Sequence, residues 1–268
     1  LWIQANVVEL QGDPVARAEV RAHVQHTMRL LQDAAGESLG LRGYAFKPQA
    51  SEWIYRGETY EFKSAIEFQR WLSGLCDSAY DGAPPLHNEL LNREELSSAA
   101  SAARRNLIEA MLTNEYDERL GIEGYPAEFS MYRSLLSAGK FHRKKKGYWS
   151  FGAPGPAWHP VWQAMKQFLR ASRKGRLPVI ELSKMLQHPP YGLRSGPIPV
   201  LLCALILAHR DTVAVYEEGV LIPELRIEVF ERFMRAPDHF ELQWYEFGSR
   251  DRKTLETIQR AIAELQLV

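Results

Sequence analysis

Cysteine is scarce in this sequence, and no stretch of it is apolar for long enough to cross a membrane. The chain has two cysteines, Cys76 and Cys203, and each lies within an apolar helical pattern. We therefore interpret both as small buried hydrophobic residues in a reducing compartment. The longest strongly apolar run, Ile198 to Ala208, is shorter than the ~20 residues that a membrane-spanning helix needs. The start of the chain lacks the basic and apolar regions of a signal peptide. These absences exclude a disulfide scaffold and predict a cytoplasmic protein with no membrane partner.

The overall composition is that of an ordinary folded protein. Apolar residues make up 46% of the chain and charged residues 25%, which excludes a disordered or collagen-like chain. The 268 residues are enough for one to three domains with a buried core. Because the chain begins with Leu1 rather than Met, we expect it to be part of a longer protein.

One stretch of the chain has no acidic residue. The 33 basic and 33 acidic residues balance overall, but residues 129–180 carry 11 basic residues and no Asp or Glu. At average composition a stretch of this length holds about six acids. The flanking parts are acidic, with 12 basic and 20 acidic residues over 1–128 and 10 and 13 over 181–268. A basic block in a neutral chain indicates a site for nucleic acid or another polyanion, and the alternative is a solvated, lysine-rich loop.

Helical periodicity and turn residues predict the elements of the first third of the chain. Asp13-Pro14 is typical of a helix start, and Arg56-Gly57 is typical of a hairpin turn. The predicted elements are a helix over 14–36 closed by Gly40 and Gly43, strands over 53–55 and 59–62, and a helix opened by a capping box from Ser64 to Glu67.

Two later segments share one order of elements, in which helices precede a β-hairpin. The first has helices over 97–113 and 126–139 and then a basic hairpin with its tip at Arg143 to Gly147; the second has helices over 161–171, 180–186 and 197–209, a hairpin over 213–222, a helix over 226–236 and a strand over 240–247. This order is typical of winged helices. We therefore predict a mainly α protein with small β-hairpins, of the α+β class: a helical region with one hairpin (1–95), two winged-helix-like units (96–155 and 156–247) and a C-terminal helix (248–268).

The two units are predicted to differ in role. The helix over 197–209 is apolar on all sides, so it is expected to be buried. The hairpin tip that follows it, Glu217-Glu218, is anionic and would repel a duplex. The second unit is therefore interpreted as structural or protein-binding. The candidate recognition helix of the first unit still offers Ser130, Arg133 and Ser134.

The candidate binding residues lie in and beside the acid-free stretch. Lysine and arginine neutralise phosphates, and an aromatic ring on the hairpin can stack on bases, although an aromatic strand more often belongs to a core. For the cations that follow the helix over 161–171, pairing with the helix C-terminus is the alternative. The candidates are Arg133, Lys140, His142, Arg143, Lys144, Lys145, Lys146, Tyr148, Arg173, Lys174 and Arg176.

No catalytic centre is recognisable in the sequence. It lacks a glycine-rich loop that ends in Gly-Lys-Ser/Thr, a Cys-x-x-Cys pair and a Gly-x-Ser-x-Gly elbow. His23 and His26 share a helix face, but no third metal ligand is near them in the sequence. Glu61 and Lys63 have the Glu-x-Lys spacing of some metal-dependent nucleases. We predict no enzyme activity and no cofactor for this chain, and we expect it neither to bind nor to hydrolyse ATP.

Two stretches resemble a known family. The first runs from Ala83-Pro84-Pro85-Leu86-His87-Asn88 through Glu94 into Arg104 and Met111, and the second is Pro189-Pro190-Tyr191-Gly192-Leu193-Arg194-Ser195-Gly196-Pro197 and the apolar residues that follow. Both are similar to stretches downstream of the nucleotide-binding domain in large bacterial phage-defence P-loop ATPases of BREX-like systems. The resemblance implies an ATP-driven, DNA-associated assembly. Because the Walker motifs are absent here, it implies an accessory region rather than the ATPase itself.

Three functional hypotheses follow from the sequence. The first is a non-catalytic region of a larger anti-phage ATPase that contacts the backbone of duplex DNA, or of another polyanion, through the basic wing. The second is a protein-interaction scaffold whose wing docks an acidic partner or the protein's own ATPase domain. The third is a Mg²⁺-dependent nuclease that uses Glu61 and Lys63.

Overall fold

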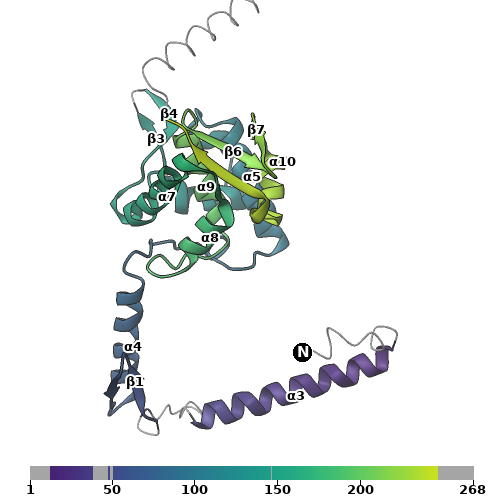
Figure 1. Ribbon diagram of the computed structural model, residues 1–268, viewed down its shortest axis with the longest axis vertical. Helices are drawn as coiled ribbons and strands as arrows, with labels where there is room; N and C mark the ends of the chain where they lie inside the picture. Colours follow the sequence, from purple (N-terminus) through teal and green to yellow (C-terminus); the bar gives the residue numbers. More distant parts are fainter. Residues whose placement is uncertain (1–12, 39–47, 49–50, 146, 247–268) are drawn as a thin grey trace, which may run out of the picture. The chain divides into compact units, whose positions relative to one another are not determined.

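The structure is a computed structural model that describes residues 13–38, 48, 51–145 and 147–246. The chain divides into two compact units, Leu1–Ser78 and Ala79–Val268. The described part combines helices with small antiparallel sheets, as Figure 1 shows, so the prediction of an α+β protein is confirmed. No helix in these described residues is both long and apolar enough to span a membrane.

The smaller unit contains a long helix and a hairpin-helix element. Helix α3 spans Pro14–Ser38, and the carboxylate of Asp13 accepts hydrogen bonds from the amides of Val15 and Ala16, as expected for an N-cap. The predicted stops at Gly40 and Gly43 lie outside the described residues. The hairpin and the following helix are β1 (Trp53–Tyr55), β2 (Glu58–Tyr60) and α4 (Ala65–Ala79).

An aromatic cluster holds this hairpin against α4. The rings of Trp53 and Phe68 lie 4.2 Å apart, and those of Phe62 and Trp71 lie 4.9 Å apart. The predicted cap at Ser64 is present, because Ser64 Oγ accepts a hydrogen bond from the amide of Glu67 at 3.2 Å. The Glu67 carboxylate accepts from the amide of Lys63 at 2.9 Å, one residue before the position that a full capping box uses. Cys76, in contrast to its predicted burial, is exposed, because the other face of α4 carries this packing.

The larger unit begins with the helices that precede the basic hairpin. They are α5 (Ser98–Thr113), the short η2 (Glu118–Gly121), α6 (Ala127–Met131) and η3 (Tyr132–Ser137), a π-helical turn that continues α6. Ser97 caps α5 through a hydrogen bond to the amide of Ala100. The hairpin itself is formed by β3 (His142–Lys145) and β4 (Tyr148–Phe151).

The rest of the larger unit follows the second predicted series closely. Its helices are η4 (Pro156–Trp158), α7 (His159–Ala171), η5 (Ser172–Lys174), α8 (Val179–Gln187), α9 (Ile198–Ala208), α10 (Ile227–Arg235) and η6 (Pro237–His239). Its strands are β5 (Leu177–Pro178), β6 (Val213–Glu217), β7 (Val220–Ile222) and β8 (Phe240–Trp244). They form one antiparallel sheet in the order β5-β8-β6-β7. The last strand therefore lies between two earlier ones, which sequence order does not reveal.

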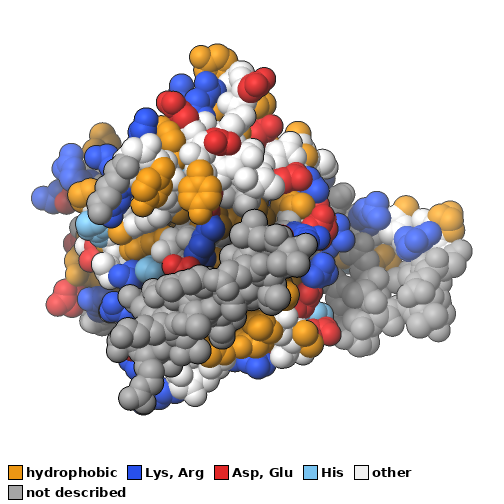
Figure 2. Space-filling view, turned by 90° about the horizontal axis from the view of Figure 1, so that it is seen from above, with side chains coloured by type: hydrophobic (Ala, Val, Ile, Leu, Met, Phe, Trp, Pro, Cys, Tyr) orange, Lys and Arg blue, Asp and Glu red, His pale blue; other side chains and the backbone are white. Residues whose placement is uncertain are grey.

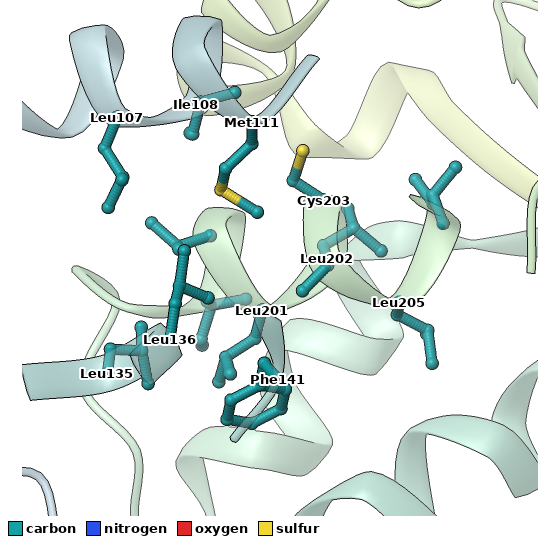
Figure 3. Packing of buried hydrophobic residues seen from close by; sticks show 14 of the residues in the cluster. Leu107, Ile108, Met111, Leu135, Leu136, Phe141, Leu201, Leu202, Cys203 and Leu205 are labelled. Atoms are coloured by element: carbon teal, nitrogen blue, oxygen red, sulfur yellow. The ribbon is translucent and has the colours of Figure 1, made fainter. Parts of the chain in front are cut away.

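A single hydrophobic core runs through the larger unit. It includes residues from Leu86 to Leu242, and α9 lies within it: Leu201, Cys203 and Leu205 are completely buried. Figure 3 shows side chains of α5, η3 and α9 packed together in this core. Residues from both predicted winged-helix-like units, 96–155 and 156–247, contribute to this core, and the second compact unit begins at Ala79. The predicted helix over 248–268 lies outside the described residues.

Two segments about a hundred residues apart are joined beside this core. The carboxylate of Glu94 accepts hydrogen bonds from the hydroxyl and amide of Ser195. The amide of Gly196 donates to the carbonyl of Arg93 at 3.0 Å, and Arg104 donates to the carbonyl of Gly196 at 3.1 Å. These contacts connect the two stretches on which the family resemblance depends.

Candidate nucleic-acid interface

The basic hairpin is firmly attached to the core of the larger unit. Beyond the strands, the amide of Gly152 donates to the carbonyl of Phe141 at 3.0 Å, and that of Gly155 donates to Gly139 at 2.9 Å. The buried ring of Phe141 lies 5.3 Å from Trp158 and 5.7 Å from Trp162. The hairpin therefore has a fixed base, and Figure 1 shows β3 and β4 at the edge of this unit.

The strand register gives the hairpin two different faces. Residues directly opposite each other in an antiparallel pair lie on the same face. His142 pairs with Phe151 and Lys144 with Trp149 on one face, while Arg143 pairs with Ser150 and Lys145 with Tyr148 on the other. The first face is buried at its base, because the ring of His142 stacks on Trp149 at 5.2 Å. We call the other face, formed by Arg143, Lys145, Tyr148 and Ser150, the outer face.

The predicted tip of the hairpin is longer than the observed one. Arg143, Lys144 and Lys145 belong to β3, which ends at Lys145, and β4 begins at Tyr148. Gly147 has a φ of 96°, in the left-handed region that glycine tolerates best. The predicted contact residue Lys146 lies outside the described residues. The cations are thus placed along a strand and alternate between the two faces instead of clustering at the tip.

Four hairpin cations are available to a ligand. Within the described part of the chain, no ion pair involves Lys140, Arg143, Lys144 or Lys145. Lys144 and Lys145 are exposed, as is Lys140 at the base of the hairpin. The absence of acids from residues 129–180 therefore has a structural counterpart, because no acidic side chain from elsewhere in the described residues neutralises the hairpin.

His142 was predicted to contact nucleic acid, and the structure corrects this prediction. Its side chain is buried, and Nε2 lies 2.7 Å from the carbonyl oxygen of Glu115, so Nε2 carries a proton and donates it. Nδ1 then accepts a hydrogen bond from the Tyr132 hydroxyl at 3.1 Å. Burial lowers the pKa of His142, with partial compensation from the Glu115 carbonyl, and raises the pKa of Tyr132 to about 12. The position of His142 on the inward face of β3 makes it a neutral structural residue.

This burial predicts a loss of stability in acid. Burial also lowers the pKa of His209. In the unfolded chain both histidines take up protons near the ordinary pKa of 6.5, whereas in the folded chain they do so only at lower pH. In the pH range between these values the unfolded chain binds more protons than the folded chain. The free energy of unfolding therefore falls as the pH decreases through this range. Each histidine adds at most ~1.4 kcal/mol per pH unit to this slope. We expect urea unfolding between pH 7.5 and 5.5 to show the loss in wild type, and His142→Phe and His209→Phe each to flatten it. An undiminished slope in both variants would contradict this assignment.

Arg173 and Arg176 differ from the hairpin cations because they have acidic partners. Arg173 pairs with Glu246 at 3.1 Å. Arg176 donates to the carbonyl of Gly219 at 3.0 Å, lies 3.8 Å from the Glu241 carboxylate and stacks over the ring of Tyr216 at 3.7 Å. The guanidinium of Arg176 thus links the segment between η5 and β5 to β8 and to the turn between β6 and β7. That Arg176 binds nucleic acid stays a prediction. Lys174 is exposed, and its contact with nucleic acid stays a prediction.

The candidate recognition helix is partly covered by a segment that the sequence did not connect with it. Asn88, which is buried, donates hydrogen bonds to the Ser134 hydroxyl at 2.8 Å and the Ser130 carbonyl at 3.2 Å. This face of α6 and η3 thus makes contacts within the protein and is not open to a ligand. Arg133 remains exposed. In the sequence, Asn88 stands out only as an asparagine that follows Pro84-Pro85. This pattern does not indicate which helix its side chain contacts.

An acidic loop lies next to the base of the hairpin. Residues 115–123 contain four acids. Glu115 is buried, accepts the His142 hydrogen bond through its carbonyl and pairs through its side chain with Arg210. Glu118 lies close enough to Tyr132 to affect that hydroxyl electrostatically. The face drawn in Figure 2 shows Lys and Arg with Asp and Glu among them.

The other candidate chemistry is not assembled into a site. Glu61 and Lys63 lie in exposed positions after β2, and His23 and His26 lie on exposed positions of α3. Among the described residues, no group of three or more His, Cys, Asp or Glu side chains is arranged to hold a metal ion. Cys203 is buried, and this burial raises the pKa of its thiol far above the ordinary value. A thiol in this environment is packed as a small hydrophobic residue.

Comparisons of this chain with models of known protein families, with curated proteins and with solved structures found no match.

Proposed function

We propose that the larger unit is a non-catalytic region that binds the backbone of nucleic acid through the hairpin β3–β4. The observation that carries the proposal is the set of four cations without ion pairs among the described residues, Lys140, Arg143, Lys144 and Lys145, on an element anchored to the core. Such cations release counterions when they bind phosphates. In this proposal the two series of helices and hairpins are winged-helix-like units, and they belong to a larger bacterial anti-phage ATPase, as the family resemblance implies.

The second winged-helix-like unit has a supporting role in this proposal. Its apolar helix α9 is buried, so it cannot lie in a groove of DNA. Its hairpin carries Glu217, which is held by Arg232 through two hydrogen bonds of 2.6 and 2.7 Å. Arg232 lowers the pKa of Glu217, and the two side chains form an ion pair. Residues 213–222 contain no lysine or arginine, so this hairpin has no cation of its own for a phosphate, and contact is assigned to the first.

A variant with three hairpin cations removed tests the proposal. Arg143→Ala/Lys144→Ala/Lys145→Ala should weaken binding to a short duplex at least about tenfold, and the salt dependence should become shallower, by up to ~0.9 in log–log slope for each phosphate that is no longer neutralised. The side chains lie at the surface of a hairpin, so the melting temperature should stay close to that of wild type. Fluorescence anisotropy at several salt concentrations measures both quantities.

A second variant distinguishes the contribution of the hairpin cations from the effect of net charge. Lys184→Ala/Arg194→Ala/Arg235→Ala removes three positive charges at exposed positions of the same unit and should leave duplex affinity within about twofold, because exposed charges beyond a Debye length of roughly 10 Å contribute little. An equal loss in both variants would show that only net charge matters. Unchanged affinity in the hairpin variant would exclude the hairpin as the binding site.

The alternative is a protein-interaction region whose hairpin docks an acidic partner surface. The observation in its favour is the position of the acidic loop beside the hairpin, with His142 Nε2 hydrogen-bonded to the Glu115 carbonyl. Positive and negative side chains that lie next to each other can both pair with opposite charges on a protein partner, whereas a nucleic acid carries negative charge only. Binding of nucleic acid that does not depend on the hairpin cations would favour this alternative.

A further inference from the structure

We infer that the hairpin binds single-stranded nucleic acid, with the ring of Tyr148 stacked on a base and the neighbouring cations on the backbone. This inference rests on the proposed function and names the ligand of the same site. It depends on the environment of one aromatic side chain, which differs from that of every other aromatic residue in the hairpin.

Tyr148 lies on the outer face of the hairpin together with two cations. It is directly opposite Lys145, and Arg143 is its diagonal neighbour. Side chains directly opposite in an antiparallel pair have Cβ atoms about 5 Å apart, and diagonal neighbours are about 7–8 Å apart. A ring and two positive charges at these separations are within reach of one base and the phosphates next to it.

Packing does not account for an aromatic residue at this position. Trp149 and Phe151 lie on the inward face, where both rings contact His142, at 5.2 and 4.8 Å. Tyr148 is 54% exposed, and within the described residues no ring contact or hydrogen bond of its side chain is present. The outer face thus presents a free π-surface beside unpaired cations, which is the combination found in sites for single strands.

A single strand fits this surface better than a duplex does. In a duplex both faces of each base are covered by its neighbours, so a tyrosine ring can reach only the backbone and the edges. In a single strand a base face is open, and stacking one base on an aromatic ring strengthens binding roughly five- to hundredfold with little dependence on sequence. The exposed ring of Tyr148 beside Lys145 and Arg143 therefore suits a single strand.

Tyr148 variants test the inference by comparing two ligands of the same sequence. Affinity for a fluorescent 12-nucleotide single strand and for its duplex would be measured by anisotropy. Tyr148→Ala should weaken single-strand binding roughly five- to hundredfold and duplex binding less than about twofold, and Tyr148→Phe should retain both. Tyr148→Leu, which keeps apolar bulk without a ring, should lose single-strand affinity like the alanine variant. Tyr125→Ala, another exposed tyrosine of this unit, serves as the control and should change neither.

The outcomes distinguish the inference from the proposed function. If Tyr148→Ala leaves single-strand affinity unchanged, or weakens both ligands equally, stacking is overturned while backbone binding by the cations stands. If the triple variant Arg143→Ala/Lys144→Ala/Lys145→Ala leaves both affinities unchanged, the proposed function fails and the inference fails with it. Quenching of 2-aminopurine placed within the single strand, present with wild type and Tyr148→Phe and absent with Tyr148→Ala and Tyr148→Leu, would support the inference. Equal quenching with all four proteins would overturn it.

Discussion

Replacing Leu205 with aspartate is expected to prevent the larger unit from folding. Leu205 is completely buried and belongs to α9, whose side chains are among those drawn in Figure 3. The substitution removes an apolar side chain and places a carboxylate where no partner is available. The cavity alone costs about 2–5 kcal/mol, and an unpaired buried carboxylate costs several more. Because natural domains are stable by only ~5–15 kcal/mol, we expect an insoluble protein or one without a cooperative thermal transition.

Two control variants show whether the loss of folding comes from the charge placed at a buried position. Leu205→Met conserves volume and should cost less than about 1.5 kcal/mol, which shows that the site tolerates an apolar substitution. Leu221→Asp changes the same residue type in β7, where the side chain is 51% exposed, and should remain soluble and cooperative. A Leu205→Asp protein that melts like wild type would mean that α9 is an exposed docking face instead of the interior of the unit.

A methyl group added at Gly196 is expected to destabilise the larger unit by about 3 kcal/mol or more. A Cβ atom at this position would lie 2.0 Å from the carbonyl oxygen of Leu91 and 3.0 Å from that of Arg93. Backbone atoms cannot rotate away as a side chain can, so the backbone at Leu91 and Arg93 must move away from that at Gly196. The hydrogen bonds from Gly196 to Arg93 and from Arg104 to Gly196 would be strained as well. In a unit of this size the loss corresponds to a decrease of roughly 6–12 °C in melting temperature.

Gly175→Ala is the matched control for this substitution. No atom lies within 4 Å of the Cβ position at Gly175, and its φ of 172° is extended backbone that alanine adopts readily. We expect a change of less than about 0.5 kcal/mol, measured by the same calorimetric scan. Equal melting temperatures for Gly196→Ala and wild type would show that residues 91–93 and 196 are not in close contact in solution.

The close packing at Gly196 also bears on the family resemblance. The two stretches that carry it meet through Glu94, Ser195, Gly196 and Arg104. Each of these residues has a structural partner in the other stretch. The stretches that carry the resemblance therefore form a junction between distant segments of the chain.

Local sequence patterns determined most of the secondary structure. The Asp13 cap, the Ser64 cap and the apolar periodicity of α5, α7 and α9 act within a few residues, so the sequence alone predicted these helices. The hairpins were predicted for the same reason, because a two-residue turn with glycine determines the pairing of the strands beside it. The burial of α9 also followed directly, since a helix without a polar face has no stable position at the surface.

Only the tertiary structure decided which of the basic residues is available. The sequence identified residues 129–180 as a basic block, but it could not show that Arg176 pairs with Glu241 of β8, that His142 points inward to the carbonyl of Glu115, or that Asn88 covers one face of α6 and η3. Each of these contacts joins residues tens of positions apart, and each depends on which face of a strand or helix is turned toward the core. A periodic sequence pattern indicates that a helix or strand has an apolar face and a polar face. The packing of distant segments selects the face that is buried, and so determines which cations and which aromatic ring remain for a ligand.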